Sequence, residues 1–227
     1  TMSGVVEVDL PQGKLRGLRK AGISRFGGIP YGQAPVGALR FMAPEPARWH
    51  GEHDALAMAP IAPQLPSRLR EAMGDFSVPQ DEDCLRLTIW TPGTDIANRP
   101  VVIWLHGGAW QSGGILPWYD GARLAAEGDV VVVAVSYRLA ALGWLPLPGG
   151  TPNAGLLDQE LAVDWVIEHI AAFGGDPTAL TLMGQSAGAS STAHGATRPC
   201  SCDCVRSPTR RRNHAASSIT RGLPHAC

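Results

Sequence analysis

The chain has 227 residues, of which 44% are hydrophobic and 17% are charged, and its formal net charge is −1. This composition is ordinary for a globular protein with one sizeable core, and the near-neutral charge gives no overall attraction to nucleic acid or to an anionic membrane. No apolar run approaches the roughly 18 residues that can span a bilayer, and the first ten residues lack the basic and apolar regions of a signal peptide. We therefore expect neither a nucleic-acid nor a membrane partner, and a cytoplasmic location.

Short strands dominate the first part of the chain. Residues 1–35 alternate short apolar runs with Gly and Pro, which indicates strands joined by turns. Residues 44–80 are rich in Pro and Ala, and we expect loop with short helices there. Further strands are predicted at 84–90 (CLRLTIW), 101–105 (VVIWL) and 131–135 (VVVAV). The last two are continuous β-branched runs, which are typical of strands buried on both faces of a parallel sheet.

The clearest helix is predicted at 156–173 (LLDQELAVDWVIEHIAAF), where apolar residues repeat along one helical stripe. Asn153 or Asp158 can serve its N-terminal end, and the segment Gly174–Pro177 ends it. A short buried strand follows at 180–183 (LTLM). Strand, helix and strand in this order predict a parallel sheet that is covered by helices.

The pentapeptide GQSAG at 184–188 follows this strand and fits the pattern G-x-S-x-G at a strand-to-helix turn. Such a turn pushes a serine hydroxyl out above the sheet edge, and flanking glycines leave room for the neighbouring strand and helix. Ser186 is therefore a candidate nucleophile. Ala187 opens the next helix, so its free N–H can face developing negative charge. An ordinary glycine-flanked turn is the alternative interpretation.

A second glycine-rich segment, LHGGAWQSGG at 105–114, follows the predicted strand VVIWL. Glycines at such a position let backbone N–H groups approach a substrate oxyanion. Gly108 and Ala109 are the candidate donors, Gly107 gives the turn its freedom, and His106 is expected to be structural rather than a base. Alone, the segment could be a plain turn, but two such motifs in this order, both at strand ends, support each other.

From about Gly13 to Ala189 the chain resembles the type-B carboxylesterase family of α/β-hydrolases, which includes bacterial para-nitrobenzyl esterases and the cholinesterases. The resemblance rests on the segments FGGIPYGQAPVGALRF, EDCLRLTIWTP, VVIWLHGGAW, VVVAVSYRLAALGWL, NAGLLDQELAVDWVIEHIAAFGGDP and LMGQSAGA. It implies an α/β-hydrolase fold, with a mostly parallel central sheet flanked by helices and truncated after the nucleophile elbow. It also implies hydrolysis of small-molecule carboxylic esters through an acyl-serine intermediate on Ser186, with no metal or organic cofactor.

The resemblance also assigns residues to the site. It implies an oxyanion hole formed by Gly107, Gly108, Ala109 and Ala187. The substrates would be uncharged esters, with Trp110 near the acyl pocket. Nothing in the sequence matches the aromatic choline site of the cholinesterases, so choline esters are not expected. The sequence indicates no particular oligomeric state.

Two buried ion pairs are implied in the same way, Arg40 with Glu82 and Arg138 with Asp176. Many relatives pair the cysteine of EDCL with an earlier cysteine, but none precedes Cys84 in this chain. That disulfide is therefore absent, which favours a reducing compartment.

The family uses a Ser–Glu–His triad whose acid and histidine lie far downstream of the serine, beyond the last residue of this chain. The chain does contain the order serine, acid, histidine, with Asp203, His214 and His225 after Ser186. These residues follow Ser186 too closely, and no strands lie between that could return them to its hydroxyl, so we expect them to form no triad. The alternative to an esterase is therefore an inactive truncated fragment or a non-catalytic interaction domain.

Residues 198–227 differ in composition from the rest: they carry a charge of +5 against −6 for residues 1–197, and they hold four of the five cysteines. A metal site at CSCDC lacks C-x-x-C spacing, and a short basic run such as RRRNH is more often solvated than bound to nucleic acid. The favoured interpretation is out-of-frame translation, because codons for PCSCDCVRSPT read from the third base can give the Leu-Phe-x-Arg-x-x-x-Gln-Ser pattern of relatives. Residues 1–197 are thus predicted to be the N-terminal part of a carboxylesterase domain. Residues 198–227 are predicted to be an aberrant, disordered tail that offers the sheet no strand.

Overall fold

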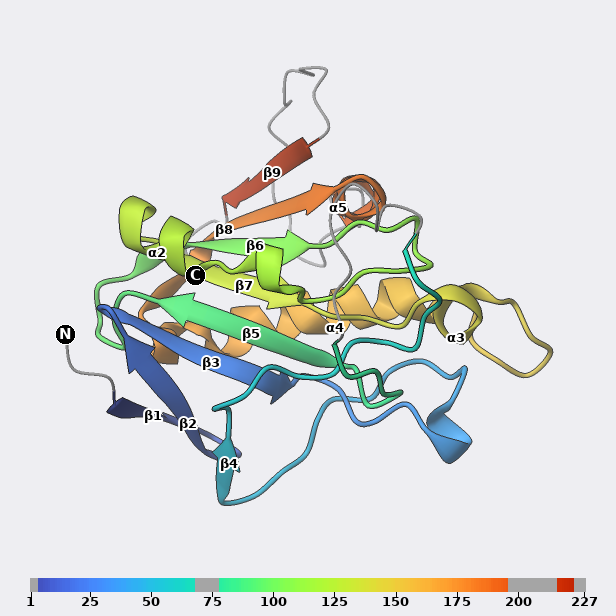
Figure 1. Cartoon of the computed structure of the whole chain (residues 1–227), viewed down its shortest axis with the longest axis horizontal. Helices are drawn as coiled ribbons and strands as arrows, with labels where there is room; N and C mark the ends of the chain where they lie inside the picture. The colour runs from blue at the N-terminus through green and yellow to red at the C-terminus, as the bar shows by residue number, and fades with distance from the viewer. Residues whose placement is uncertain (1–3, 68–77, 196–215, 223–227) are drawn as a thin grey trace, which may run out of the picture.

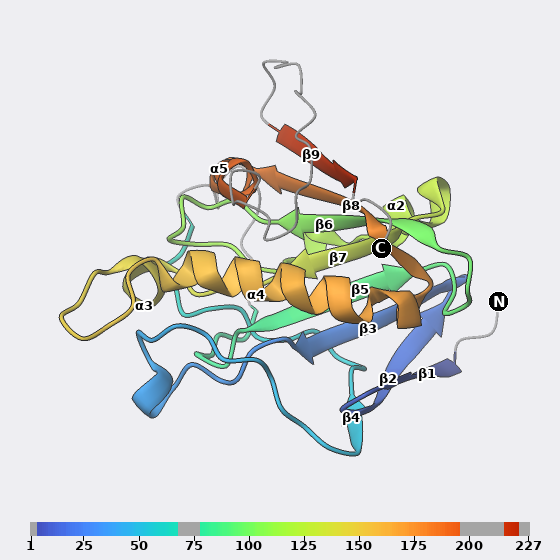
Figure 2. The same ribbon diagram turned by 180° about the vertical axis from the view of Figure 1, so that it is seen from behind.

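The computed structural model describes residues 4–67, 78–195 and 216–222. A twisted sheet runs through the molecule, with α4 along one face and α2 on the other (Figure 1 and Figure 2). The strands are β1 (Gly4–Leu10), β2 (Gly13–Lys20), β3 (Ile23–Pro30), β4 (Glu52–Asp54), β5 (Arg86–Thr91), β6 (Arg99–Leu105), β7 (Val131–Val135), β8 (Gly175–Gln185) and β9 (Ala216–Gly222). The helices are α2 (Ala122–Gly128), α3 (Ala140–Trp144), α4 (Ala154–His169) and α5 (Ala187–Gly195), with short 3-10 helices η1 (Gly37–Leu39), η2 (Pro117–Tyr119) and η3 (Ile170–Phe173).

The strand order is β1-β2-β3-β5-β7-β6-β8-β9, with β4 beside β2. The predicted parallel arrangement is present in the middle of the sheet, where β6 pairs in parallel with both β7 and β8. The chain passes through α2 between β6 and β7 and through α4 between β7 and β8, as parallel neighbours require. On one side β1, β2, β3, β5 and β7 pair antiparallel in succession, so the sheet as a whole is mixed.

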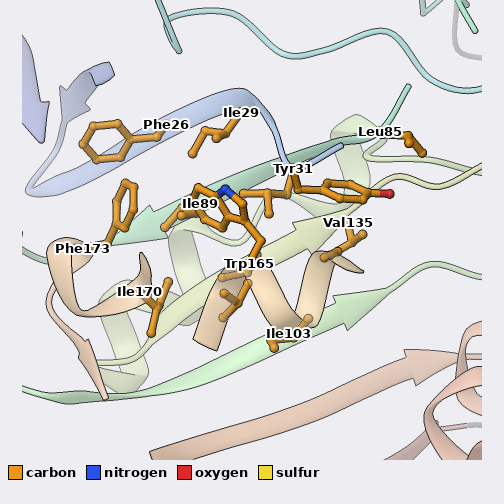
Figure 3. Close-up of a cluster of buried hydrophobic side chains, with 14 of the residues drawn as sticks. Phe26, Ile29, Tyr31, Leu85, Ile89, Ile103, Val135, Trp165, Ile170 and Phe173 are labelled. Carbon is orange, nitrogen blue, oxygen red and sulfur yellow. The ribbon is translucent and has the colours of Figure 1, made fainter. Parts of the chain in front are cut away.

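The core lies between the sheet and the helix α4 with its continuation η3. Figure 3 shows the side chains of Phe26 and Ile29 from β3 facing Trp165 of α4 and Phe173 of η3. The rings of Phe26 and Phe173 meet edge to face with centroids 5.1 Å apart. All five residues of β7 are buried, as predicted for VVVAV, whereas buried and half-buried residues alternate along VVIWL in β6.

The predicted helix is present, but its ends differ from the prediction. The α-helical part begins at Ala154, and Ile170–Phe173 continues it as a 3-10 helix. Neither predicted cap forms: Asn153 stands at the N-cap position with φ +55° and no side-chain capping bond, and the Asp158 carboxylate binds Arg138 instead. A buried guanidinium is a stronger partner for that carboxylate than the helix's own N–H groups.

One of the two predicted ion pairs is wrong. The guanidinium of Arg40 does bind Glu82, at 2.6 Å, although 43% of the arginine side chain is exposed and the pair is not buried as expected. Arg138 pairs with Asp158 and not with Asp176, whose Oδ1 accepts hydrogen bonds from the backbone N–H and the hydroxyl of its neighbour Thr178.

The prediction that residues 198–227 offer no strand is wrong for one segment. Residues 216–222 form β9, which pairs antiparallel with the whole second part of β8, from Ala179 to Gln185 (Figure 1). Backbone pairing does not require an alternating apolar pattern, which explains why this strand could not be predicted from the sequence. The Cys200–Cys204 segment lies outside the described residues, and the out-of-frame interpretation of residues 198–227 stays a prediction.

Cys84 is buried with a free thiol, and burial raises its pKa to about 12.

Within residues 4–67, 78–195 and 216–222, no helix has both the length and the apolar character needed to cross a membrane.

Candidate active site

The turn predicted at Ser186 has the expected strained geometry. Strand β8 ends at Gln185 and helix α5 begins at Ala187, so Ser186 alone makes the turn between them. Its φ is +54°, a left-handed conformation that is uncommon for a residue with a side chain and that persists only where the surroundings enforce it. The Ser186 side chain is exposed at the carboxyl end of the central strands.

Close packing explains the two glycines of the motif. A Cβ at Gly184 would lie 2.4 Å from the carbonyl carbon of Gly188. A Cβ at Gly188 would lie 2.1 Å from the carbonyl oxygen of Leu105, the last residue of β6. Larger residues would push α5 away from both strands, so these glycines let the turn sit directly against the end of β6.

The segment after β6 lies against the Ser186 turn. A Cβ at Gly107 would lie 2.8 Å from the carbonyl oxygen of Gln185 and 3.3 Å from Cβ of Ser186. Gly108 has φ +122° and Ala109 has φ +55°, and the N–H groups of Gln111 and Ser112 donate to the Gly108 carbonyl. We call residues Gly107–Ala109 the oxyanion turn, after the role that the sequence predicts for them. The structure thus brings together the three candidate positions after β6, the serine, and Ala187 at the free N-terminal end of α5.

Trp110 connects this turn to α5. Its indole N–H donates to the hydroxyl of Ser191 at 3.2 Å, and its ring lies 5.3 Å from that of Trp144. Its backbone, at φ +57°, accepts a hydrogen bond from the N–H of Ala140. Trp110 therefore lies beside the elbow helix, next to the oxyanion turn.

His106 is buried beneath the oxyanion turn and is not placed to act as a base. Its ring stacks on Tyr137 with centroids 4.3 Å apart, and the Tyr137 hydroxyl donates to the His106 carbonyl. Burial lowers the pKa of His106 to about 4, so the ring is neutral near pH 7. Nδ1 lies 2.9 Å from the carbonyl of Gly107. Since a carbonyl only accepts, Nδ1 carries the proton and holds the first residue of the turn.

Sequence reasoning missed one contact at this site. The hydroxyl of Tyr119, in η2, donates to Oε1 of Gln185 at 2.7 Å. The two residues are far apart in the chain and neither belongs to a periodic pattern. The only available signal was that Gln185 occupies the x position directly before the serine.

No described residue completes a triad. Within the described part of the chain, the hydroxyl of Ser186 has no hydrogen-bond partner. Asp203, His214 and His225 lie outside the described residues. Among residues 4–67, 78–195 and 216–222, no three or more His, Cys, Asp or Glu side chains form a group that could bind a metal ion.

Comparison with known proteins places this geometry in a family. The model of the carboxylesterase family matches residues 4–207. The para-nitrobenzyl esterase of Bacillus subtilis (strain 168) is 46% identical over 187 residues, which cover 80% of this chain and 38% of that protein. The phenmedipham hydrolase of Pseudarthrobacter oxydans is 45% identical over 193 residues, which cover 82% of this chain and 38% of that protein.

Solved structures give the same result. A thermophilic para-nitrobenzyl esterase superposes with a TM-score of 0.77 at 42% identity, over 82% of this chain and 40% of that chain. The carboxylesterase of Geobacillus stearothermophilus gives a TM-score of 0.73 at 44% identity, over 82% of this chain and 38% of that chain. The chain thus spans about two fifths of the length of these relatives. It has the α/β-hydrolase fold over that portion, and it belongs to the carboxylesterase family.

Proposed function

We propose that this chain carries the nucleophile and the oxyanion hole of a serine esterase that hydrolyses uncharged carboxylic esters. The observation that supports it most is the strained Ser186 turn, which is packed against the oxyanion turn. Ordinary loops do not hold a serine in a left-handed conformation beside a second turn of left-handed residues. The names of the relatives, an esterase and a hydrolase among them, support the same reaction class.

In the proposed reaction, Oγ of Ser186 attacks the ester carbonyl carbon, and the carbonyl oxygen becomes an oxyanion. The N–H groups of Gly108, Ala109 and Ala187 donate to that oxyanion, with Gly107 shaping the turn. The intermediate collapses with loss of the alcohol and leaves an acyl-serine, which water then cleaves to release the carboxylic acid. Donors of this kind are each typically worth on the order of 10²–10³ in turnover.

The proton of Ser186 must pass to a base in the first step and return to the leaving alcohol. A serine hydroxyl without such a base is a weak nucleophile at neutral pH. The described residues offer no base at hydrogen-bond distance, so the base and the acid that orients it have to come from outside them. Without them, the oxyanion hole and binding alone can still give about 10³–10⁴ over the uncatalysed reaction.

We further propose that the acyl group of the ester lies near Trp110. Its indole N–H is already bound to Ser191, so the ring offers a substrate mainly apolar surface. Apolar surface at this position suits an uncharged acyl chain better than a charged one, because a buried charge without a partner is costly.

A fluorophosphonate probe tests the proposal, because it labels a serine that is both activated and next to an oxyanion hole. Since an activated serine needs a base, the probe is applied to a version of the chain in which the reading frame after residue 197 is shifted and extended to the length of the relatives. We expect label on Ser186 of that version, mapped by mass spectrometry, and none on its Ser186→Ala variant. Ser190→Ala is the matched control, since Ser190 is an exposed serine one helical turn further along α5. A folded extended version that takes up no label, or that is labelled equally after Ser186→Ala, would contradict the proposal and favour a non-catalytic role.

A second experiment addresses the missing base. The 227-residue chain is compared with a version in which the reading frame after residue 197 is shifted and extended to the length of the relatives. We expect the longer version to hydrolyse short nitrophenyl esters, and Ser186→Ala in it to lower turnover by on the order of 10⁶. The 227-residue chain should stay near background. Fast turnover by that chain, lost on replacing His214 or His225, would show instead that residues 198–227 supply the base.

A further inference from the structure

Gln185 touches both ends of the segment 107–119, which carries the oxyanion turn. Its main-chain carbonyl lies against Gly107, where an added Cβ would be only 2.8 Å away. Its side-chain Oε1 accepts the hydrogen bond from the hydroxyl of Tyr119 at 2.7 Å. One residue, directly before Ser186, therefore holds the start and the end of this segment.

The position of the Tyr119 hydroxyl is itself well defined. The Tyr119 ring packs against Trp104 of β6, with centroids 5.4 Å apart, and edge to face against Trp118 at 5.8 Å. Trp104 lies on the strand that leads into the oxyanion turn. The Tyr119–Gln185 hydrogen bond thus joins the end of β8 to a ring that is already fixed on β6.

We propose that Gln185 is a positioning residue which, through Tyr119, sets the placement of the oxyanion turn relative to Ser186. This inference rests on the proposed function. Ser186 is strained, and a strained turn keeps its geometry only where its neighbours are held. Oxyanion donors act only when they lie about 2.7–3.1 Å from the developing charge, and a misplacement of about 1 Å can cost on the order of 10² in rate. The contact should therefore affect the acylation step more than ester binding.

Hydrogen exchange of the full chain, followed by mass spectrometry, tests the placement without requiring activity. Tyr119→Phe and Gln185→Met each remove one end of the hydrogen bond. We expect each variant to speed amide exchange in segments 106–114 and 183–190 by roughly tenfold. The reason is that the loss of one hydrogen bond lowers the free energy needed to open these segments locally. The double variant should be no faster than either single one, because both remove the same bond.

Two further variants separate this contact from general weakening. Gln185→Glu keeps an acceptor for the Tyr119 hydroxyl and should exchange at close to the original rate. Tyr31→Phe removes a hydroxyl of the same kind, which donates to the Ser136 carbonyl at 2.7 Å, and should leave both segments unchanged. If Tyr119→Phe speeds exchange to the same extent throughout β7 and α4, the contact acts through general stability and the inference is overturned.

The fluorophosphonate probe then tests the link to reactivity. In the version extended to the length of the relatives, the labelling rate at saturating probe should fall roughly tenfold in Tyr119→Phe and Gln185→Met, with the half-saturating probe concentration unchanged. An extended version that takes up no label before any substitution would count against the proposed function, whereas the exchange experiment on the 227-residue chain would still test the placement. Unchanged exchange in segment 106–114 of Tyr119→Phe, or a change confined to the half-saturating concentration, would overturn the inference.

Discussion

Arg138 and Asp158 form a buried ion pair that joins the chain after β7 to the start of α4. Nη2 and Nε of the arginine lie 2.6 Å and 2.8 Å from the two carboxylate oxygens, and the backbone N–H of Arg138 donates to the same group. Only 2% and 0% of the two side chains are exposed. Because Nη1 of Arg138 also donates to the carbonyl of Met42, the pair fixes three segments of the chain at once.

Removal of one partner from this pair should be strongly destabilising. Asp158→Asn leaves a buried guanidinium without its counter-charge, and we expect it to lower the free energy of unfolding by about 3–5 kcal/mol. Urea unfolding followed by circular dichroism measures the change. Glu127→Gln is the control, because Glu127 pairs with Arg123 in an exposed ion pair on α2, and such pairs contribute little to stability. Equal losses in the two variants would mean that the Arg138–Asp158 pair is not a main source of stability.

This pair also illustrates what the sequence could and could not predict. Strands such as VVVAV and the helix α4 were predictable, since their apolar residues follow the period of the element that buries them. The Ser186 turn was predictable because glycine is needed on both sides of it. The partner of Arg138 was not, since ion pairing depends on how elements pack, and no pattern in the sequence records that.

The same limit applies to the contact between Tyr119 and Gln185 and to β9. A single hydrogen bond between a 3-10 helix and a strand end leaves no periodic trace. Strand β9 pairs through its backbone with β8 at the end of the strand order. Its residues, ASSITRG, have little of the apolar alternation by which strands are recognised.

Acid should weaken the fold through His106. Its pKa in the folded chain is about 4, against an ordinary value of 6.5, because burial disfavours the charged ring. Below pH 6.5 the unfolded chain therefore binds a proton that the folded chain does not, and the free energy of unfolding falls as the pH drops toward 4. The loss from this group should reach about 3 kcal/mol.

Urea unfolding between pH 7.5 and pH 4.5 measures this dependence. His106→Asn keeps a side-chain N–H for the Gly107 carbonyl but does not titrate, so it should reduce the slope. His53 and His169, whose pKa values burial also lowers, remain in both chains and cancel in the comparison. Parallel curves for the two chains would show that His106 is not buried as a neutral ring.

Gly188→Ala should separate α5 from β6. The added methyl group would lie 2.1 Å from the Leu105 carbonyl oxygen, so the helix has to shift. Overpacking of this kind costs about 1–3 kcal/mol, and each kcal/mol lowers the Tm of a chain this size by roughly 2–4 °C. Gly4→Ala is the control, because nothing lies within 4 Å of a Cβ at that position. Calorimetry gives the Tm values, and a Gly188→Ala chain that melts with the control would contradict the close packing of the elbow.

The pairing of β9 with β8 should protect the chain from association. Register runs from Ala179 opposite Gly222 to Gln185 opposite Ala216, so β9 covers the backbone of the elbow strand. Of two adjacent residues in β9, one directs its N–H toward β8, and the paired substitution Ser218→Pro with Ile219→Pro removes that donor whichever it is. An uncovered β8 would present unpaired backbone groups to other chains. We therefore expect the proline variant to associate at concentrations where the original chain does not, as measured by size-exclusion chromatography with light scattering.

The matched control replaces the same two residues with alanine, which keeps both N–H groups, and it should behave like the original chain. If the proline and alanine variants elute with the same mass, β9 does not protect the edge, and the elbow strand tolerates exposure without it.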